Sequence, residues 1–167
     1  MAIGQFVNDV KDKEWAKNTI FIFVADHGFR GDSKFSINWE NFRIPLLVWS
    51  PGNIFKPEVN NVTGSQVDIL PTIMGVLGGE YKNSSWGKNL FEANPDGSYA
   101  FIVQNNFYGV VNGDYFLIDG DGVKPKLVDL KSAEYVDNKH AVDVLHKVVR
   151  TYLELETYQL KNGTFAD

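Results

Sequence analysis

The stretch 19-TIFIFVADHG-28 determines how the rest of the chain is interpreted. Thr19 to Ala25 form one apolar run, rich in β-branched and aromatic residues and without alternation, which is typical of a strand buried on both faces. An acid and an imidazole, Asp26 and His27, follow directly. Ligands of α/β sheets gather at the carboxyl ends of strands, so this pair is either a metal site or a strand terminus that happens to carry polar residues.

The chemistry of the pair suits a transition metal. A carboxylate oxygen and a neutral imidazole are good ligands for zinc or manganese and poor ones for calcium. Neighbouring side chains on a strand point apart, but Gly28 permits a turn that would let Asp26 and His27 reach one point.

A catalytic metal usually has three protein ligands and an open position, and the pair supplies only two. His140 and His146 are six residues apart on an expected helix, a spacing that does not place them on one face. Glu40 and Asp68 are further candidates, although no spacing selects them. The site therefore lacks at least one ligand.

Length, charge and composition exclude several classes of protein. The 167 residues suffice for one domain with a core, and the net charge of -5 argues against a nucleic-acid surface. No apolar run approaches the roughly 20 residues of a membrane helix, and no signal peptide is visible. The absence of cysteine excludes disulfides, thiolate catalysis and cysteine-type zinc sites.

The first part of the chain alternates helices and strands. The pattern predicts helix, strand, strand and helix, which favours an α/β fold with parallel strands. Ser65 and Asp68 lead into the last helix, and Gly78-Gly79 ends it. The four elements are expected at residues 3–17, 19–25, 44–49 and 65–77.

From Tyr99 onward the pattern changes to short strands. Asn112-Gly113 is a strong hairpin signal between two of them. Asp119-Gly-Asp-Gly122 is interpreted as a turn, because the further ligands of a calcium loop are absent. A helix packing on the sheet is expected at 133–160, and the strands at 99–103, 107–111, 115–118 and 127–130.

Several motifs in order resemble the alkaline phosphatase/sulfatase superfamily. The run from Asn18 to Gly28 is similar to the strand whose Asp-His pair binds the catalytic metal there. Three further segments and a closing strand also match family signatures: 42-FRIPLLVWSPG-52, 66-QVDILPT-72, 86-WGKNLF-91 and 127-LVDL-130. The resemblance implies the C-terminal portion of an alkaline-phosphatase-like three-layer sandwich, with a parallel α/β part at 1–98 and a hairpin region plus a long helix at 99–167.

Within the superfamily, 107-FYGVVNGD-114 is similar to the lipoteichoic acid synthase/phosphoglycerol transferase branch. The Asp-His pair agrees with that branch, since calcium-dependent arylsulfatases more often carry Asn or Gln beside the Asp. Many sulfatases continue with Gly-Glu-His, whereas Gly31-Asp32-Ser33 stands here. In such relatives a nucleophilic Thr and an acidic ligand lie upstream, and only 25 residues precede Asp26.

The resemblance therefore implies the C-terminal half of a metal-dependent phosphotransferase or hydrolase, inactive by itself. Asp26 and His27 would hold manganese or zinc, and Arg30 and Lys34 would neutralise a phosphodiester such as a phosphoglycerol lipid head group. The longer protein would be membrane-anchored on the extracytoplasmic face of a bacterial cell. The alternatives are a sulfate-ester hydrolase and a non-catalytic, truncated binding module, and the fragment is expected to self-associate.

Overall fold

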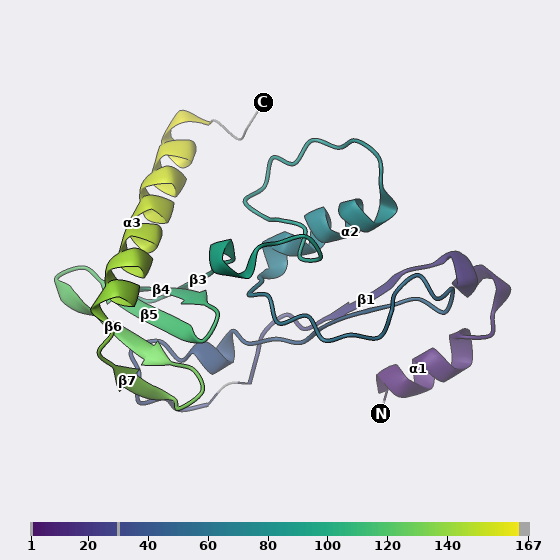
Figure 1. Cartoon of the computed structure of the whole chain (residues 1–167), viewed down its shortest axis with the longest axis horizontal. Helices are drawn as coiled ribbons and strands as arrows, with labels where there is room; N and C mark the ends of the chain where they lie inside the picture. The colour runs from purple at the N-terminus through teal and green to yellow at the C-terminus, as the bar shows by residue number, and fades with distance from the viewer. Residues whose placement is uncertain (1, 30, 164–167) are drawn as a thin grey trace. The chain divides into compact units, whose positions relative to one another are not determined.

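The computed structural model describes residues 2–29 and 31–163 and divides the chain into two compact units (Figure 1). Unit 1 comprises Met1–Lys34 and Asn38–Val59, and unit 2 comprises Phe35–Ile37 and Asn60–Asp167. The boundary that the sequence pattern suggested, between residues 98 and 99, falls inside unit 2.

Unit 1 contains one α-helix and a two-stranded sheet. The expected helix at 3–17 ends at Val10, because the apolar repeat that begins at Ile3 also ends there. A short 3-10 helix replaces its second half. The elements are α1 (Ala2–Val10), η1 (Glu14–Asn18), β1 (Phe21–Val24), η2 (Trp39–Asn41) and β2 (Leu46–Trp49).

The two strands of unit 1 are antiparallel, so the prediction of parallel pairing was wrong. Phe21 pairs with Trp49 and Val24 pairs with Leu46. Adjacent parallel strands need a crossover connection, usually an α-helix. The connection between β1 and β2 contains only the three-residue η2 among its described residues, so the chain returns in the opposite direction.

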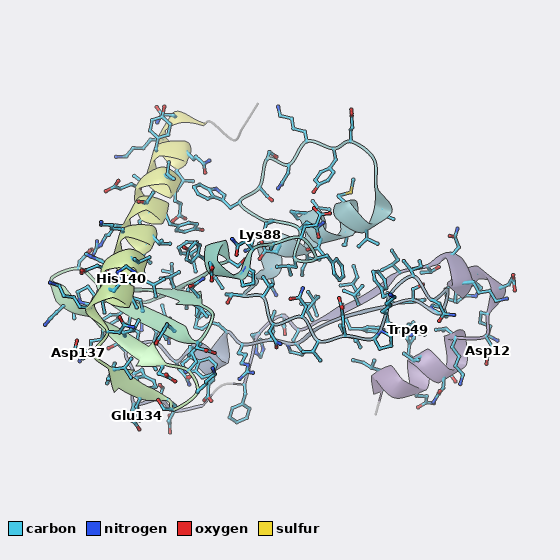
Figure 2. The ribbon with its side chains drawn as sticks, in the orientation of Figure 1. Asp12, Trp49, Lys88, Glu134, Asp137 and His140 are labelled. Atoms are coloured by element: carbon cyan, nitrogen blue, oxygen red, sulfur yellow. The ribbon has the colours of Figure 1, made fainter. Side chains whose placement is uncertain are left out.

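Aromatic side chains join α1 to the sheet. The ring of Phe6 packs edge-on against Phe21 and Phe23, with ring centroids 5.4 and 5.8 Å apart. Phe21 also stacks at 5.2 Å on Trp49, a residue labelled in Figure 2. Such edge-to-face and offset pairs add to the free energy gained from burying apolar area.

Unit 2 is built on a five-stranded antiparallel meander in the order β3-β4-β5-β6-β7. The predicted hairpin is confirmed, since Asn112 pairs with Tyr115 and Gly113 has a φ of 55°. The helix that Ser65 introduces is also confirmed. The elements are η3 (Gln66–Asp68), α2 (Ile69–Leu77), η4 (Pro95–Gly97), β3 (Ala100–Gln104), β4 (Phe107–Asn112), β5 (Tyr115–Gly120), β6 (Val123–Asp129), β7 (Glu134–Val136) and α3 (Lys139–Asn162).

The helix α3 covers one face of this sheet (Figure 1). Leu145 and Val149 of α3 pack on three strand residues, Val110, Leu117 and Leu127, all at most 3% exposed. This cluster is the core of unit 2.

A short segment covers the other face. Phe35–Ile37 precedes the rest of unit 2 in the chain, and Ile37 is fully buried. A Cβ at Gly109 of β4 would meet the side chains of both Ile37 and Phe116, and the ring of Phe35 packs edge-on against Tyr135 at 5.1 Å. Both faces of β5 are therefore covered, which explains its continuous buried run.

The predicted start of the last helix was wrong. Glu134–Val136 extend the sheet as β7, after a backbone turn in which Ala133 has a φ of 54°. The helix begins only after Asn138, whose side chain accepts a hydrogen bond from the Ala141 N–H at 3.1 Å. A capping asparagine marks a helix start more directly than apolar spacing does.

A buried acid anchors α3 to β5. Asp119 is 1% exposed, and its Oδ2 lies 2.8 Å from Arg150 Nε and 3.4 Å from His146 Nε2. The guanidinium of Arg150 and the carboxylate of Asp119 thus form an ion pair between α3 and β5. The neighbouring carboxylate raises the pKa of Arg150.

Within residues 2–29 and 31–163, none of the helices combines the length and the apolar composition that crossing a membrane requires.

Candidate metal centre

Asp26 and His27 lie just beyond the end of β1 and face solvent. The strand ends at Val24, and the chain bends at the two residues. Their side chains are 90% and 57% exposed, respectively. They therefore lie together at the carboxyl end of a strand as predicted, although that strand is antiparallel to its neighbour.

The imidazole of His27 is oriented by its own backbone. Nδ1 lies 2.8 Å from the carbonyl oxygen of Gly28, and because a carbonyl only accepts, Nδ1 carries the proton and donates. In the neutral ring this leaves Nε2 as the atom with a lone pair, the usual arrangement of a metal-binding histidine.

The carboxylate of Asp26 faces the same atom. Asp26 Oδ1 lies 3.9 Å from His27 Nε2, and it also accepts a hydrogen bond of 2.9 Å from the backbone N–H of His27. One oxygen and one nitrogen donor thus stand close together, a set that fits zinc or manganese.

Gly28 fixes the position of this bend by close packing. Its N–H donates to the carbonyl oxygen of Asn41 at 2.8 Å. A Cβ on Gly28 would collide with the carbonyl oxygen of Glu40 and would lie 2.8 Å from that of Arg43. The sequence indicated glycine as a source of conformational freedom, whereas the structure requires its small size.

Two asparagines that the sequence analysis did not select support the same loop. Asn38 Nδ2 donates to the carbonyl oxygen of Gly31 at 2.8 Å, and Asn41 Oδ1 accepts from the Gly31 N–H at 3.3 Å. Asn38 also accepts from the Glu40 N–H at the start of η2, and it is only 7% exposed. An asparagine directly before a helical turn was the signal available in the sequence.

Three further candidate residues follow the pair in the sequence, Arg30, Lys34 and Glu40. Lys34 is exposed in the loop that follows the pair, and Arg30 lies outside the described residues. Glu40 is exposed in η2, with its backbone against Gly28. Among the residues that the structure describes, no group of three or more His, Asp or Glu side chains is placed to hold a metal. Asp26 and His27 therefore fit a metal as part of a larger ligand set.

Asp68 is not available as a ligand, because its carboxylate is a structural acceptor. It is 1% exposed, and it accepts the N–H of Ser65 at 2.7 Å and the N–H of Lys88 at 2.8 Å. Lys88 Nζ also lies 3.5 Å from Asp68 Oδ2. The carboxylate therefore joins the start of α2 to the segment around Lys88.

Thr72 strengthens the same junction. Its hydroxyl donates to the carbonyl oxygen of Asp68 at 2.6 Å and accepts from the Leu90 N–H at 3.0 Å. A Cβ on Gly87 would collide with the carbonyl oxygen of Val67. The motifs at 66–72 and 86–91 are thus two halves of one interlocked structure.

The sequence of the chain is similar to those of known sulfatases. Residues 1–79 match the Sulfatase family model. An endo-4-O-sulfatase from Bacteroides thetaiotaomicron is 28% identical over 99% of this chain and 32% of its own length. An arylsulfatase from Clostridium perfringens is 28% identical over 91% of this chain and 37% of its own. The chain spans about a third of the length of these relatives.

A lipoteichoic acid synthase-like protein of Bacillus subtilis, YvgJ, is 24% identical over 84% of this chain and 24% of its own length. In three dimensions, the chain superimposes on a protein in the alkaline phosphatase superfamily from Vibrio parahaemolyticus, with a TM-score of 0.79 at 19% identity. That match covers 99% of this chain and 41% of the other. The α/β fold of the alkaline phosphatase type is thereby confirmed. The family match over residues 1–79 and the similarity to these relatives support a place for the chain in the alkaline phosphatase/sulfatase superfamily.

Proposed function

We propose that this chain supplies two ligands, Asp26 and His27, to the metal centre of an enzyme that hydrolyses sulfate esters. The observation that supports the proposal most directly is the orientation of the pair. The hydrogen bond from His27 Nδ1 to the Gly28 carbonyl leaves the lone pair on Nε2, and Asp26 Oδ1 lies 3.9 Å from that atom. Relatives that match nearly the whole chain are named as sulfatases.

The residues of the chain have separable roles in this proposal. Asp26 contributes charge and an oxygen donor, and His27 contributes a neutral nitrogen. Gly28 and the two asparagines, Asn38 and Asn41, hold the loop so that both donors stay exposed. A divalent ion, zinc or manganese, would activate a hydroxyl nucleophile and polarise the ester when it is bound.

The nucleophile and the remaining ligands are proposed to come from polypeptide outside this sequence. The described residues bring no third acid or histidine to Asp26 and His27. Lys34, exposed in the following loop, would neutralise the anionic ester, and Arg30 is proposed for the same task. Residues 1–167 alone are therefore expected to show no turnover of sulfate or phosphate esters.

Manganese titration monitored by NMR tests the metal site directly. The chain has three histidines, His27, His140 and His146, so each imidazole can be assigned by substitution. Paramagnetic manganese should broaden the His27 signals first, at a concentration well below that which affects His140. The Asp26→Asn variant should require more metal for the same broadening, whereas His140→Gln, on the exposed start of α3, should behave as the unchanged protein.

Two results of the titration would contradict the proposal. Equal broadening of all three histidines would show that the metal has no preferred site and would refute the proposal. A submicromolar affinity of residues 1–167 that His27→Ala abolishes would show that the ligand set is complete without other polypeptide.

A second candidate is phosphoglycerol transfer on a phospholipid head group. It is favoured by the similarity to YvgJ and by the Asp-His pair followed by Gly31-Asp32-Ser33. The longer protein would then be membrane-anchored with this domain on the extracytoplasmic face. Assays of the full-length natural protein with nitrophenyl sulfate and with bis-nitrophenyl phosphate discriminate the two candidates. A sulfatase should release nitrophenol faster from the sulfate ester, and a phosphoglycerol transferase should release it faster from the phosphodiester. Metal binding without turnover of either ester would favour a non-catalytic binding module.

A further inference from the structure

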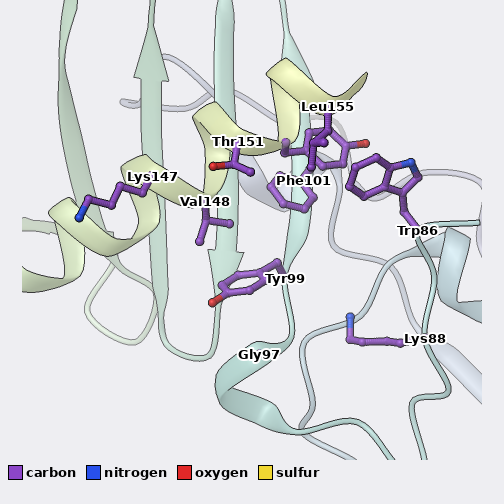
Figure 3. Close-up of a pocket in the computed structure, with 10 residues that line it drawn as sticks. Trp86, Lys88, Gly97, Tyr99, Phe101, Lys147, Val148, Thr151 and Leu155 are labelled. Atoms are coloured by element: carbon purple, nitrogen blue, oxygen red, sulfur yellow. The ribbon is translucent and has the colours of Figure 1, made fainter. Parts of the chain in front are cut away.

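Unit 2 contains a cavity of about 400 Å³ that the metal site does not use. It lies between α3, β3 and the segment around Trp86 (Figure 3). All of its lining residues belong to unit 2, so its shape does not depend on unit 1. This volume is within the range of small-molecule sites.

The apolar part of the lining consists of four aromatic rings and two aliphatic side chains, those of Trp86, Tyr99, Phe101, Tyr152, Val148 and Leu155. Phe101 and Tyr152 stack on each other at 3.8 Å, and Trp86 packs edge-on against Tyr152 at 5.3 Å. The indole N–H of Trp86 donates to Gln159 Oε1 at 2.9 Å, which fixes the ring while it remains 47% exposed. Burial raises the pKa of Tyr152, with a smaller contribution from Glu156, so its phenol stays neutral.

Two lysines, Lys88 and Lys147, also line the cavity. Figure 3 shows Lys147 and Lys88 on opposite sides of Tyr99. The ammonium of Lys88 lies 3.5 Å from Asp68 Oδ2, and that carboxylate also accepts two backbone N–H groups. Lys147 is exposed on α3. Two cations beside a hydrophobic surface, in a chain of net charge -5, favour a ligand that is both anionic and partly apolar.

We propose that this cavity binds an anionic saccharide. A pyranose ring has one face of C–H groups, whose slight positive charge is attracted to the negative face of an aromatic ring such as Trp86 or Tyr99. Its sulfate or carboxylate substituent would lie beside Lys88 or Lys147, and the hydroxyl of Thr151 would meet a sugar hydroxyl. The site is a second binding site, and it does not rest on the metal ligands.

Fluorine NMR of the full chain labelled with 5-fluorotryptophan provides the test. Of the four tryptophans, Trp15, Trp39 and Trp49 belong to unit 1, so Trp86 is the only reporter in unit 2. The probe is glucosamine 2-N,6-O-disulfate, compared with N-acetylglucosamine and with sodium sulfate. The disulfate should shift the Trp86 signal alone, in a saturable manner.

Substitutions then assign the contacts. Lys147→Gln should weaken binding roughly two- to fivefold, the range expected for one exposed ion pair. Lys139→Gln, an exposed lysine on the same helix, should leave the affinity unchanged. Lys88→Gln should also weaken binding, and a single sharp Trp86 signal in the ligand-free variant would confirm that unit 2 stays folded.

Three results would overturn the proposal. No Trp86 shift at millimolar disulfate would show that the cavity does not bind such sugars. Equal affinity for N-acetylglucosamine would show that the lysines play no part. An equal shift with sodium sulfate would reveal anion binding without a saccharide. Each readout is at Trp86, so a failure here is distinguishable from a failure of the metal site at His27.

Discussion

At the scale of single residues, the candidate centre depends on short backbone contacts around two exposed side chains. The sequence predicted Asp26 and His27 as a pair because chemistry and position coincide at a strand end. It did not reveal why Gly28 is needed, since close approach to the carbonyls of Glu40 and Arg43 depends on a loop that returns from residues later in the chain. Non-local packing of this kind leaves no local pattern.

Gly28→Ala should therefore destabilise unit 1. The added methyl group would collide with the Glu40 carbonyl, and overpacking typically costs about 1–3 kcal/mol. Urea denaturation measures the change. Gly4→Ala is the matched control, because a Cβ at Gly4 meets nothing within 4 Å and alanine favours the helix α1 by up to about 1 kcal/mol. Equal effects of the two substitutions would show that Gly28 is not tightly packed.

At the scale of elements, local signals were reliable and pairing signals were not. The hairpin at Asn112-Gly113 and the helix introduced by Ser65 are encoded in a few adjacent residues, and both were predicted. The antiparallel pairing of β1 with β2 was missed because direction depends on the connection, and not on the strands. The strand β7 was missed because residues 134–136 were included in the helix predicted at 133–160, whereas the helix begins only after its cap, Asn138.

The interlocked motifs make a stability prediction. Asp68→Ala would remove the acceptor of two backbone N–H groups, those of Ser65 and Lys88, in a site where the carboxylate is 1% exposed. We expect a loss of about 2–4 kcal/mol, because each unsatisfied buried donor costs on the order of 1–3 kcal/mol. Asp96→Ala in the exposed η4 should change the free energy of unfolding by less than about 0.5 kcal/mol. A small effect at Asp68 would mean that water replaces the carboxylate.

The turn between β6 and β7 should make stability depend on pH. Hydrogen bonds from the backbone N–H groups of Ser132 and Lys131 lower the pKa of Asp129 below its ordinary value. Because the pKa of Asp129 is lower in the folded chain than in the unfolded one, its carboxylate stabilises the folded state. This contribution is complete at a pH above the unfolded pKa of about 3.9, and it is lost as the pH falls through the folded pKa. The difference in urea midpoint between the unchanged protein and Asp129→Asn should be largest at neutral pH and shrink in acid. Parallel pH profiles would contradict this.

At the scale of the whole molecule, unit 1 leaves much apolar surface uncovered. Val24, Leu46 and Leu47 on its two strands are 40–47% exposed, and Phe29 is 82% exposed. Of the apolar residues in its described part, only Ala16 is fully buried. A sheet with so little cover is expected to be completed by other polypeptide.

The isolated chain should therefore self-associate. The open edges and apolar side chains of β1 and β2 would pair with a second copy where no other polypeptide covers them. Light scattering should give a mass above 18.8 kDa that increases with concentration. Leu47→Lys, which places a charge on this surface, should shift the equilibrium toward the monomer, whereas Lys139→Gln should not. A strict monomer at high concentration would mean that unit 1 is self-contained.

Unit 2 also draws three residues, Phe35–Ile37, from within the stretch of chain that builds unit 1. The two units cannot therefore be separated by a single cut at residue 59, since that cut would deprive the sheet of Ile37, which is fully buried. A chain of residues 60–167 would begin with an unfilled hole over Phe116 and Gly109. In genetic terms the two units are interleaved along the chain. A recombination point between residues 37 and 60 would therefore exchange the loop that bears Asp26 and His27 together with Phe35–Ile37, which belong to unit 2.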